Sequence, residues 1–218
     1  MARGGRGHPA RLQGAAVIAA GLVVAALVVM LLAARASGSS GATPEGFGPL
    51  PSGAASELPG GHNDWDDTIR AALLAAGFEP AAIDRYAILV KAIIQQESGW
   101  NPGARGDYDP NRCAQPYRTY ADTAGYCSLG FGQIHRYWHP DLASGYDLLE
   151  GTRNIRAMAV LLVRLRGAVG DDVERLAAAW NGGTSAGLAY PNVTWQVQRY
   201  VANVHGAWAR WAGEVGLA

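Results

Sequence analysis

Residues 80–97 read PAAIDRYAILVKAIIQQE, and this stretch decides the fold. Pro80 is tolerated in the first turn of a helix, so the stretch predicts a helix that runs to about Glu97. At about 100° per residue, one face of this helix collects the apolar side chains, which are Ile83, Tyr86, Val90, Ile93 and Ile94. Glu97 continues this face, whereas Lys91 and the two glutamines after Ile94 do not. The pattern therefore places a carboxyl group on the side of the helix that is expected to pack against a core.

The predicted position of Glu97 is costly, because a carboxylate that faces a core must be neutral or paired. Burial favours the uncharged acid and so raises the pKa of a carboxyl group. The negative end of the helix dipole acts in the same direction. A glutamic acid that keeps its proton near neutral pH is what general-acid catalysis requires. In the other interpretation, the side chain simply turns away where the helix ends at Ser98-Gly99.

Most of the chain after residue 61 shows helical periodicity. Apolar residues recur every four positions between Asp64 and Ala76, and three later stripes lie in residues 155–165, 173–180 and 197–211. No segment alternates convincingly over the length of a strand, so the predicted fold class is all-α. Residues 99–147 form a long stretch rich in Gly, Pro, Tyr and Asp. A structureless stretch of that length is unusual in a compact domain and is often functional.

The composition excludes several classes of protein. The 218 residues leave room for one domain of ordinary size, and the formal net charge of zero argues against a nucleic-acid partner. Apolar residues make up 49% of the chain, which excludes wholesale disorder. The 29 glycines show no three-residue period, which excludes collagen. Two cysteines cannot supply a four-thiolate zinc site.

The N-terminal 61 residues are interpreted as an export signal or membrane anchor followed by a linker. Residues 1–36 contain three arginines followed by an uncharged apolar run at 15–34, and about 20 such residues span a bilayer. The arginines place the N-terminus in the cytoplasm, which makes the chain a single-pass membrane protein with its domain outside the cytoplasm. In the alternative, the run is a signal peptide cleaved after Ala36 and the domain is secreted. Residues 37–61 form a Gly/Ser/Pro-rich linker, and the exported domain covers 62–218.

Two features of residues 99–147 concern cross-links and metals. Cys113 and Cys127 lie in an exported segment, so a disulfide is expected between them, with two free thiols as the alternative. Asp107-x-Asp109-x-Asn111 mimics the first half of a calcium loop, but arginines replace the glycine and the glutamate that such a loop requires. His135 and His139 could share a helix face, but they have no acidic third ligand nearby and Pro140 follows them. We therefore expect neither a metal nor a cofactor.

Five short blocks resemble a known family when they are taken in order along the chain. Glu97 lies in QQESGWNP (residues 95–102), which resembles the Glu-Ser-Gly-aromatic-Asn-Pro signature of the soluble lytic transglycosylases. The other blocks, each similar to a block of that family, are GFGQI (130–134), Asn154-Ile155, AWNGG (179–183) and residues 196–200. The resemblance spans residues 93–200. It implies a lysozyme-like helical domain that carries a long loop insertion.

The resemblance also implies a substrate and a reaction. Members of that family cleave the β-1,4 bond between N-acetylmuramic acid and N-acetylglucosamine in peptidoglycan. A single glutamate, here Glu97, protonates the bridging oxygen and then takes a proton from the muramic C6 hydroxyl, which leaves a 1,6-anhydro end. An acid that becomes a base needs a pKa near ambient pH. Substrate-assisted enzymes need no second carboxylate as nucleophile. The implied partner is the glycan strand, and a monomer is expected.

The resemblance assigns the supporting roles by matched position. Gln133 and Asn181 would bind the sugar or its N-acetyl group, and Tyr200 would orient Glu97. The backbone at Gly130 and Phe131 would line the cleft. Ser98 and Trp180 are also placed among the substrate-binding residues, although Trp180 lies on a core stripe too and its indole suits either use.

Two departures from the family pattern and two other functions remain open. The family's serine that follows its glutamate corresponds to Gly106, for which Ser128 is a candidate replacement, and its second glutamate corresponds to Gln196. A goose-type-lysozyme-like muramidase would share the fold and the acid but add water. It would need an aspartate to hold that water, and the candidates are Asp107, Asp109 and Asp122. A non-catalytic peptidoglycan-binding scaffold is the remaining alternative.

Overall fold

The structure, a computed structural model, describes residues 57–217. The expected membrane segment at 15–34 and most of the expected linker at 37–61 lie outside the described residues. From residue 57 to residue 217, no helix is both long and apolar enough to cross a membrane.

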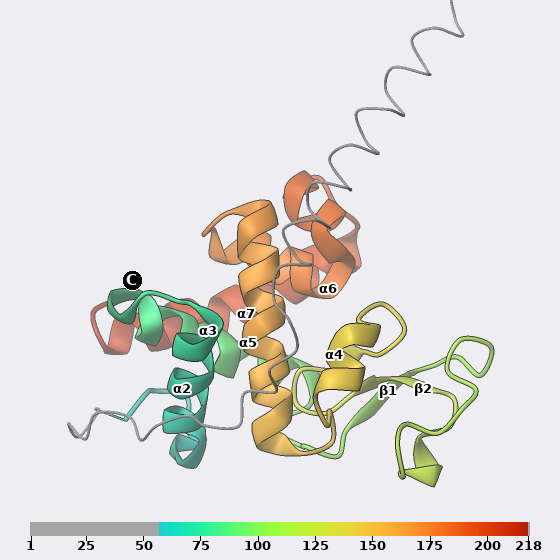
Figure 1. Cartoon of the computed structure of the whole chain (residues 1–218). Helices are drawn as coiled ribbons and strands as arrows, with labels where there is room; N and C mark the ends of the chain where they lie inside the picture. Colours follow the sequence, from blue (N-terminus) through green and yellow to red (C-terminus); the bar gives the residue numbers. More distant parts are fainter. Residues whose placement is uncertain (1–56, 218) are drawn as a thin grey trace, which may run out of the picture. The chain divides into compact units, whose positions relative to one another are not determined.

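The described part of the chain is mostly helical, as predicted (Figure 1). Its longer helices are α2 (Asp66–Ala76), α3 (Ile83–Glu97), α5 (Gly151–Val169), α6 (Val173–Ala189) and α7 (Trp195–Glu214). A short α4 (Pro140–Gly145) and the 3₁₀ turns η1 (Asn63–Trp65), η2 (Pro80–Ala82) and η3 (Ala121–Thr123) accompany them. Pro80 thus opens a 3₁₀ turn ahead of α3, and α3 ends at Glu97 as the sequence predicts.

Residues 99–147 contain a small sheet that the all-α prediction missed. Strands β1 (Arg105–Tyr108), β2 (Tyr126–Leu129) and β3 (Ile134–His135) form one antiparallel sheet in the order β1-β2-β3. Gly106 pairs with Ser128, and Ser128 pairs in turn with His135. The prediction was wrong here because strands of 4, 4 and 2 residues are too short to show an alternating pattern.

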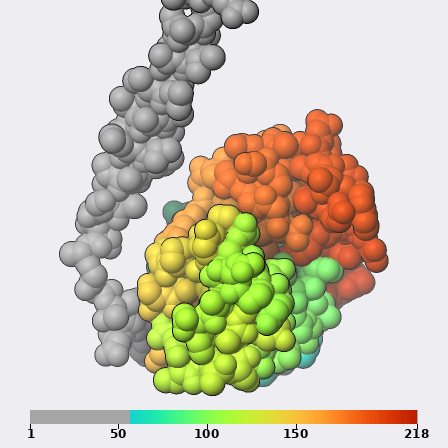
Figure 2. All heavy atoms as spheres, turned by 90° about the vertical axis from the view of Figure 1, so that its right-hand side faces the viewer, coloured from blue at the N-terminus to red at the C-terminus, as the bar shows by residue number. Residues whose placement is uncertain are grey.

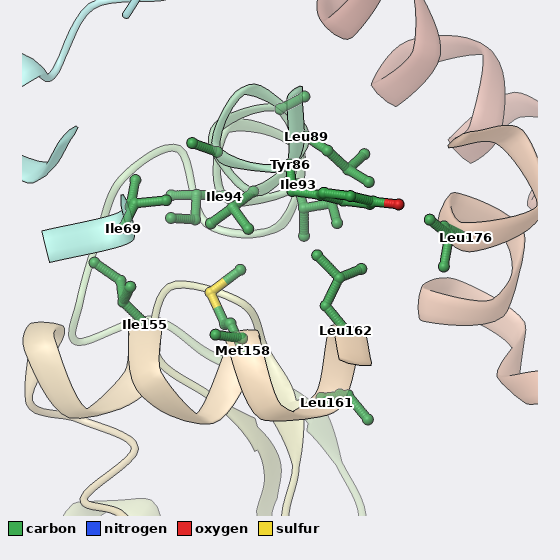
Figure 3. Close-up of a cluster of buried hydrophobic side chains, with 14 of the residues drawn as sticks. Ile69, Tyr86, Leu89, Ile93, Ile94, Ile155, Met158, Leu161, Leu162 and Leu176 are labelled. Carbon is green, nitrogen blue, oxygen red and sulfur yellow. The ribbon is translucent and has the colours of Figure 1, made fainter. Parts of the chain in front are cut away.

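Helix α3 forms the centre of the helical part. Every residue from Tyr86 to Ile94 is buried, so the helix is covered on all sides over this length. It packs against α2 and α7, and Figure 3 shows its Ile93 and Ile94 above Ile155 and Met158 of α5. Full burial of one such aliphatic side chain stabilises a fold by about 1.5–3 kcal/mol. The end of α3, which carries Glu97, is therefore held by the best-packed part of the domain.

A buried ion pair covers the side of α3 that lies off the predicted apolar face. Lys91 has no exposed surface, and its Nζ donates to Asp66 Oδ1 at 2.6 Å and to the Leu58 carbonyl at 3.2 Å. The other oxygen of Asp66 accepts the Leu58 N–H at 2.7 Å. Leu58 is itself buried. Leu58, which lies before the boundary expected at residue 62, is thus packed against the domain.

Residues 109–147 are fastened by a disulfide and by polar contacts, in addition to buried side chains such as Leu129 and Ile134. The expected disulfide is formed, and it joins Cys113 to Cys127 with their Cα atoms 5.5 Å apart. Arg136 donates from Nη2 to the carbonyls of Cys113 and Gln115, each at 2.8 Å. The Tyr117 hydroxyl donates to the Ala143 carbonyl at 2.9 Å. These contacts tie the loop before β2 to β3 and α4.

Candidate active site

Glu97 is the last residue of α3, and the chain turns sharply after it. The Ser98 N–H donates to the Ile94 carbonyl at 3.1 Å, and Gly99 then adopts the left-handed conformation, with φ at 56°, that commonly ends a helix. Trp100 also has a positive φ, and its indole is buried against Phe131 and His62. The turn directs the chain toward the sheet and leaves Glu97 at the junction between the helical part and residues 99–147.

The Glu97 side chain stays inside the protein instead of turning away into solvent. The hydroxyl of Tyr200, a buried residue of α7, donates to Glu97 Oε1 at 2.7 Å. Burial raises the pKa of Glu97 to about 7. Hydrogen bonds from Tyr200 and, to a smaller extent, Trp180 act to lower this pKa, and the negative charge of Asp107 acts to raise it. A large share of the Glu97 carboxyl groups therefore carries a proton at neutral pH.

Tyr200 stays neutral next to this carboxyl group. Burial and the neighbouring charge of Glu97 raise the pKa of Tyr200 well above its usual value. Its hydroxyl hydrogen is thus always available to donate to Glu97 Oε1. One oxygen of the carboxyl group is fixed by this contact, so the direction of the other oxygen is limited.

A cleft of about 830 Å³ opens in front of Glu97. One wall comes from the sheet segment and includes Ser128, Gln133 and His135. The other wall is helical: it includes Glu97 at the end of α3 and residues of α5 and α6, among them Trp180 and Asn181. The two parts of the chain meet on the face shown in Figure 2, where the sheet segment is green to yellow and α6 is orange. Asn181 is brought to the cleft just before the break in α6 at Gly183, whose φ and ψ are not helical.

Gln133 is held in a fixed orientation on its wall. Its backbone is left-handed, with φ at 47°, and its Nε2 donates to the Gly130 carbonyl at 2.9 Å. A Cβ atom on Gly106 would lie 2.4 Å from Gln133 Oε1. Gly106, where the resembled family has serine, is thus the position that leaves room for the Gln133 amide. Glu97, Gln133 and Asn181, matched from three separate sequence blocks, line the same cleft.

Comparison with known families agrees with this geometry. A family model for the transglycosylase SLT domain matches residues 82–192, just over half of the chain. The chain belongs to the SLT domain family. Its members are lytic transglycosylases that act on peptidoglycan, so the matched region supports activity of that general type. A search among curated proteins gave no match.

Two residues that the sequence placed at the cleft lie beneath it in this SLT domain. Phe131 is 1% exposed and packs edge-on against Trp65, with ring centroids 5.0 Å apart. Gly130 has φ at 76°, and a Cβ atom there would lie 2.0 Å from the Leu148 carbonyl oxygen. Neither is among the residues that line the cleft. They form the support under Gln133, because the tight packing needs a glycine followed by a buried ring.

Asn154 has a structural role that the sequence did not indicate. It is fully buried, and its Nδ2 donates to the carbonyls of Leu129 and Leu148 at 3.2 and 2.8 Å. Its Oδ1 accepts the Gly132 N–H at 3.1 Å. The Asn-Ile block of the SLT domain therefore ties α5 to the turn that carries Gln133. Because Asn154 lies in a family block, the sequence alone could have indicated that this residue has a specific role.

Two serines expected near the substrate have different surroundings. Ser98 donates from Oγ to the Ile94 carbonyl at 3.3 Å and does not line the cleft. Ser128 lines the cleft, stands opposite Gly106 in the sheet and donates its hydroxyl hydrogen to Asp107 Oδ2. The cross-strand position is consistent with the suggestion that Ser128 replaces the serine missing at residue 106.

The cleft of the SLT domain also contains residues that were not assigned to it. Asp107, His139 and the largely exposed Trp138 line it too, and Asp107 has a left-handed backbone with φ at 51°. Burial lowers the pKa of His135 and of His139. Within residues 57–217, no group of three or more His, Cys, Asp or Glu side chains is arranged to hold a metal ion. In the sequence, Asp107 was noted as one of the acidic residues of the insertion.

Proposed function

We propose that this chain cleaves the β-1,4 bond between N-acetylmuramic acid and N-acetylglucosamine in peptidoglycan and leaves 1,6-anhydromuramic ends. The observation that carries the proposal is the Glu97 carboxyl group, which lines the cleft and has a pKa raised to about 7 by burial. A group with such a pKa can donate and accept a proton near neutral pH at comparable cost.

The proposed reaction uses Glu97 twice. Its proton passes to the bridging oxygen as the bond from that oxygen to the muramic C1 breaks, and the muramic N-acetyl group stabilises the positive charge that develops. The Glu97 carboxylate then takes the proton of the C6 hydroxyl, whose oxygen forms the new bond to C1. Glu97 recovers its proton and no water is consumed, so one carboxyl group suffices.

The other groups of the site position the reactants in this proposal. Tyr200 holds Glu97 Oε1 at 2.7 Å, which directs the remaining oxygen toward the substrate. Gln133 and Asn181 lie on opposite walls, where their amides can donate to and accept from the sugar and its N-acetyl group. Trp180 lines the cleft beside Glu97 and offers an indole face against which a sugar ring can pack.

Replacing Glu97 by glutamine tests the proposal directly. Glu97→Gln preserves size and hydrogen bonding to Tyr200 but removes the transferable proton. We expect turnover of purified peptidoglycan to fall by a factor of about 10²–10⁴, the usual contribution of a general acid–base group. Mass spectrometry of the released fragments measures this. Tyr200→Phe serves as a control, since it removes the contact to Oε1 and leaves the acid. Cleavage at the original rate in the Glu97→Gln variant would exclude the mechanism.

A muramidase that adds water to the same bond is the second candidate, and Asp107 is the observation that favours it. This carboxylate lines the cleft and its charge acts on Glu97, so it is placed to hold an attacking water molecule. The products separate the candidates, because hydrolysis gives reducing ends that are heavier than anhydro ends by one water. Reducing ends in the wild-type digest, lost in Asp107→Asn, would favour the muramidase and contradict the anhydro product.

We also propose that residues 15–34 hold the domain at the outer side of a membrane, on the basis of their apolar run and the arginines before it. The expected result is that the intact chain stays in the membrane fraction after alkaline carbonate extraction. A soluble exported chain whose sequence starts after Ala36 would instead indicate a cleaved signal peptide.

A further inference from the structure

A second pocket beside the cleft is lined by charged side chains of one sign. It measures about 760 Å³ and lies between residues 112–118 and α4. Three arginines line it, Arg112, Arg118 and Arg136, and no acidic residue does. The chain as a whole has a formal net charge of zero, so this concentration of one sign is a local feature.

Two of the three arginines have only neutral hydrogen-bond partners. Arg118 donates from Nη2 to the carbonyls of Ser144 and Tyr146 at 2.8 and 2.9 Å, and Arg136 donates to carbonyls as described above. These bonds hold the loop in place but cancel no charge. Asp147, the acid whose charge acts on Arg118, is itself engaged by the Tyr120 hydroxyl at 2.8 Å.

Arg112 is an exposed arginine of this pocket. Its side chain is 50% exposed, and its Nε lies 3.6 Å from Asp109 Oδ2, beyond hydrogen-bond distance. The other oxygen of Asp109, Oδ1, accepts the N–H groups of Asn111 and Arg112, so this carboxylate faces the guanidinium through Oδ2 alone. Most of the donor capacity of the Arg112 guanidinium is therefore open to a ligand, and an arginine fork suits a carboxylate well.

The charged pocket and the cleft share one rim. Tyr137 lines the pocket and the adjacent Trp138 lines the cleft. Both rings are about half exposed, and the Arg112 guanidinium lies 5.5 and 5.2 Å from their centroids. A polymer bound in the cleft can thus pass a side branch over Tyr137 and Trp138 into the pocket without leaving the surface.

We propose that this pocket binds a carboxylate of the peptide branch carried by muramic acid, with Arg112 as the direct contact. The inference rests on the proposed function, because a glycan strand in the cleft is what brings the peptide to the rim. Peptidoglycan carries its free carboxylates on these peptides, and each strand bears them at the sugar next to the cleaved bond. Arg118 and Arg136 supply the long-range field, and the pocket selects peptide-bearing strands over bare ones.

The test measures binding of two glycan probes to the full chain in a Glu97→Gln background, so that no probe is cleaved. One probe is a soluble glycan fragment with its peptides. The other is the same fragment after an amidase has removed them, so that its only carboxylates are the lactyl groups left on the muramic rings. We expect the peptide-bearing probe to bind about five-fold more tightly, which is the upper range for a partly exposed charge pair. Arg112→Gln should abolish this difference, and Arg112→Lys should restore part of it.

Arg153→Gln is the matched control. Arg153 is also exposed and also lies near a carboxylate three residues earlier, Glu150, at 3.9 Å, but it does not line the pocket. The Arg153→Gln variant should leave the difference in affinity between the two probes unchanged. Thermal unfolding of each variant shows whether the fold is intact, and unchanged affinity for the bare probe shows that the cleft is intact.

Three results would overturn the inference. Equal wild-type affinity for the two probes is the first, and an equal loss for both probes in Arg112→Gln is the second. The third is Arg112-dependent binding of a soluble glycerol phosphate oligomer in place of the peptide-bearing probe, which would assign the pocket to a phosphodiester polymer. Failure of the wild-type chain to bind or cleave the bare glycan would instead count against the proposed function, independently of Arg112.

Discussion

The two walls of the cleft are held by different forces. The helical wall includes Glu97 at the end of α3, and the residues of α3 from Tyr86 to Ile94 are all buried, most of them among apolar neighbours. The wall that carries Gln133 also has buried side chains such as Ile134, but it is held in addition by a disulfide, a buried asparagine and arginine bonds to carbonyl groups. Apolar burial sets the proton affinity of Glu97, whereas directional polar contacts fix the position of Gln133. One wall thus tunes the acid and the other aligns the sugar in our proposal.

Breaking the helical wall should have the largest effect on stability. Ile93 is fully buried in α3, so Ile93→Ala leaves a cavity and should lower the free energy of unfolding by about 2–5 kcal/mol. Denaturant unfolding measures this loss. Ile93→Val, which removes a single methyl group, should cost only about 0.5–1.5 kcal/mol. If the alanine variant unfolded at the same denaturant concentration as wild type, the helical wall could not be the main source of rigidity.

The proton affinity of Glu97 gives the next largest effect. Its pKa rises from 4.5 to about 7 on folding, so the folded state binds this proton more tightly than the unfolded state does. The resulting stabilisation is complete below pH 4.5 and is lost as the pH rises through 7, a change of about 3 kcal/mol. Unfolding free energies of wild type and Glu97→Gln, compared across this range, should converge or cross as the pH rises. A difference that is constant with pH would contradict the raised pKa.

The same pKa predicts the pH dependence of activity. The free enzyme must carry the Glu97 proton for the first step, so kcat/KM should fall as the pH rises above about 7. Steady-state rates on soluble peptidoglycan fragments would establish this profile.

A small change in the sheet wall should affect catalysis more than stability. In Gly106→Ala the new methyl group would meet Gln133 Oε1 and displace the amide, while the backbone of Gly106 suits any residue. We expect kcat/KM to fall roughly ten-fold, because small misplacements of a positioning group are costly, with an unfolding free energy within about 1 kcal/mol of wild type. Gly167→Ala on α5, where no atom lies within 4 Å of the added Cβ, is the matched control. An unchanged kcat/KM in Gly106→Ala would show that Gln133 does not position the substrate.

The helical wall was largely predictable from the sequence, and the sheet wall was not. The 3.6-residue period found α3, its end and the inward direction of Glu97, because that signal accumulates over four turns. The sheet left no such signal, because its strands are only 4, 4 and 2 residues long. Each strand also pairs with residues that lie elsewhere in the sequence, which a local pattern cannot show. The burial of Lys91 was also not predicted. It depends on contacts with Asp66 and Leu58, which the periodicity of α3 alone cannot reveal.

Motif blocks found residues of the sheet wall but not their arrangement. Gln133 was identified by its block, yet the same block suggested that Gly130 and Phe131 face the cleft, whereas they pack beneath it. Asp107 appeared in the sequence as part of an incomplete calcium loop or as a candidate water-binding aspartate. Its left-handed backbone and its bond from Ser128 place it in the cleft, and both depend on the sheet register.

The Lys91–Asp66–Leu58 contact has a mechanical consequence. Lys91 and Glu97 stand on the same helix, separated by about 9 Å of axial rise. A load applied to the chain ahead of Leu58 would first be borne by the buried ammonium and carboxylate groups, which grip that segment through both its N–H and its carbonyl. Tension on the chain ahead of Leu58 would therefore be borne on a side of α3 that Glu97 does not share.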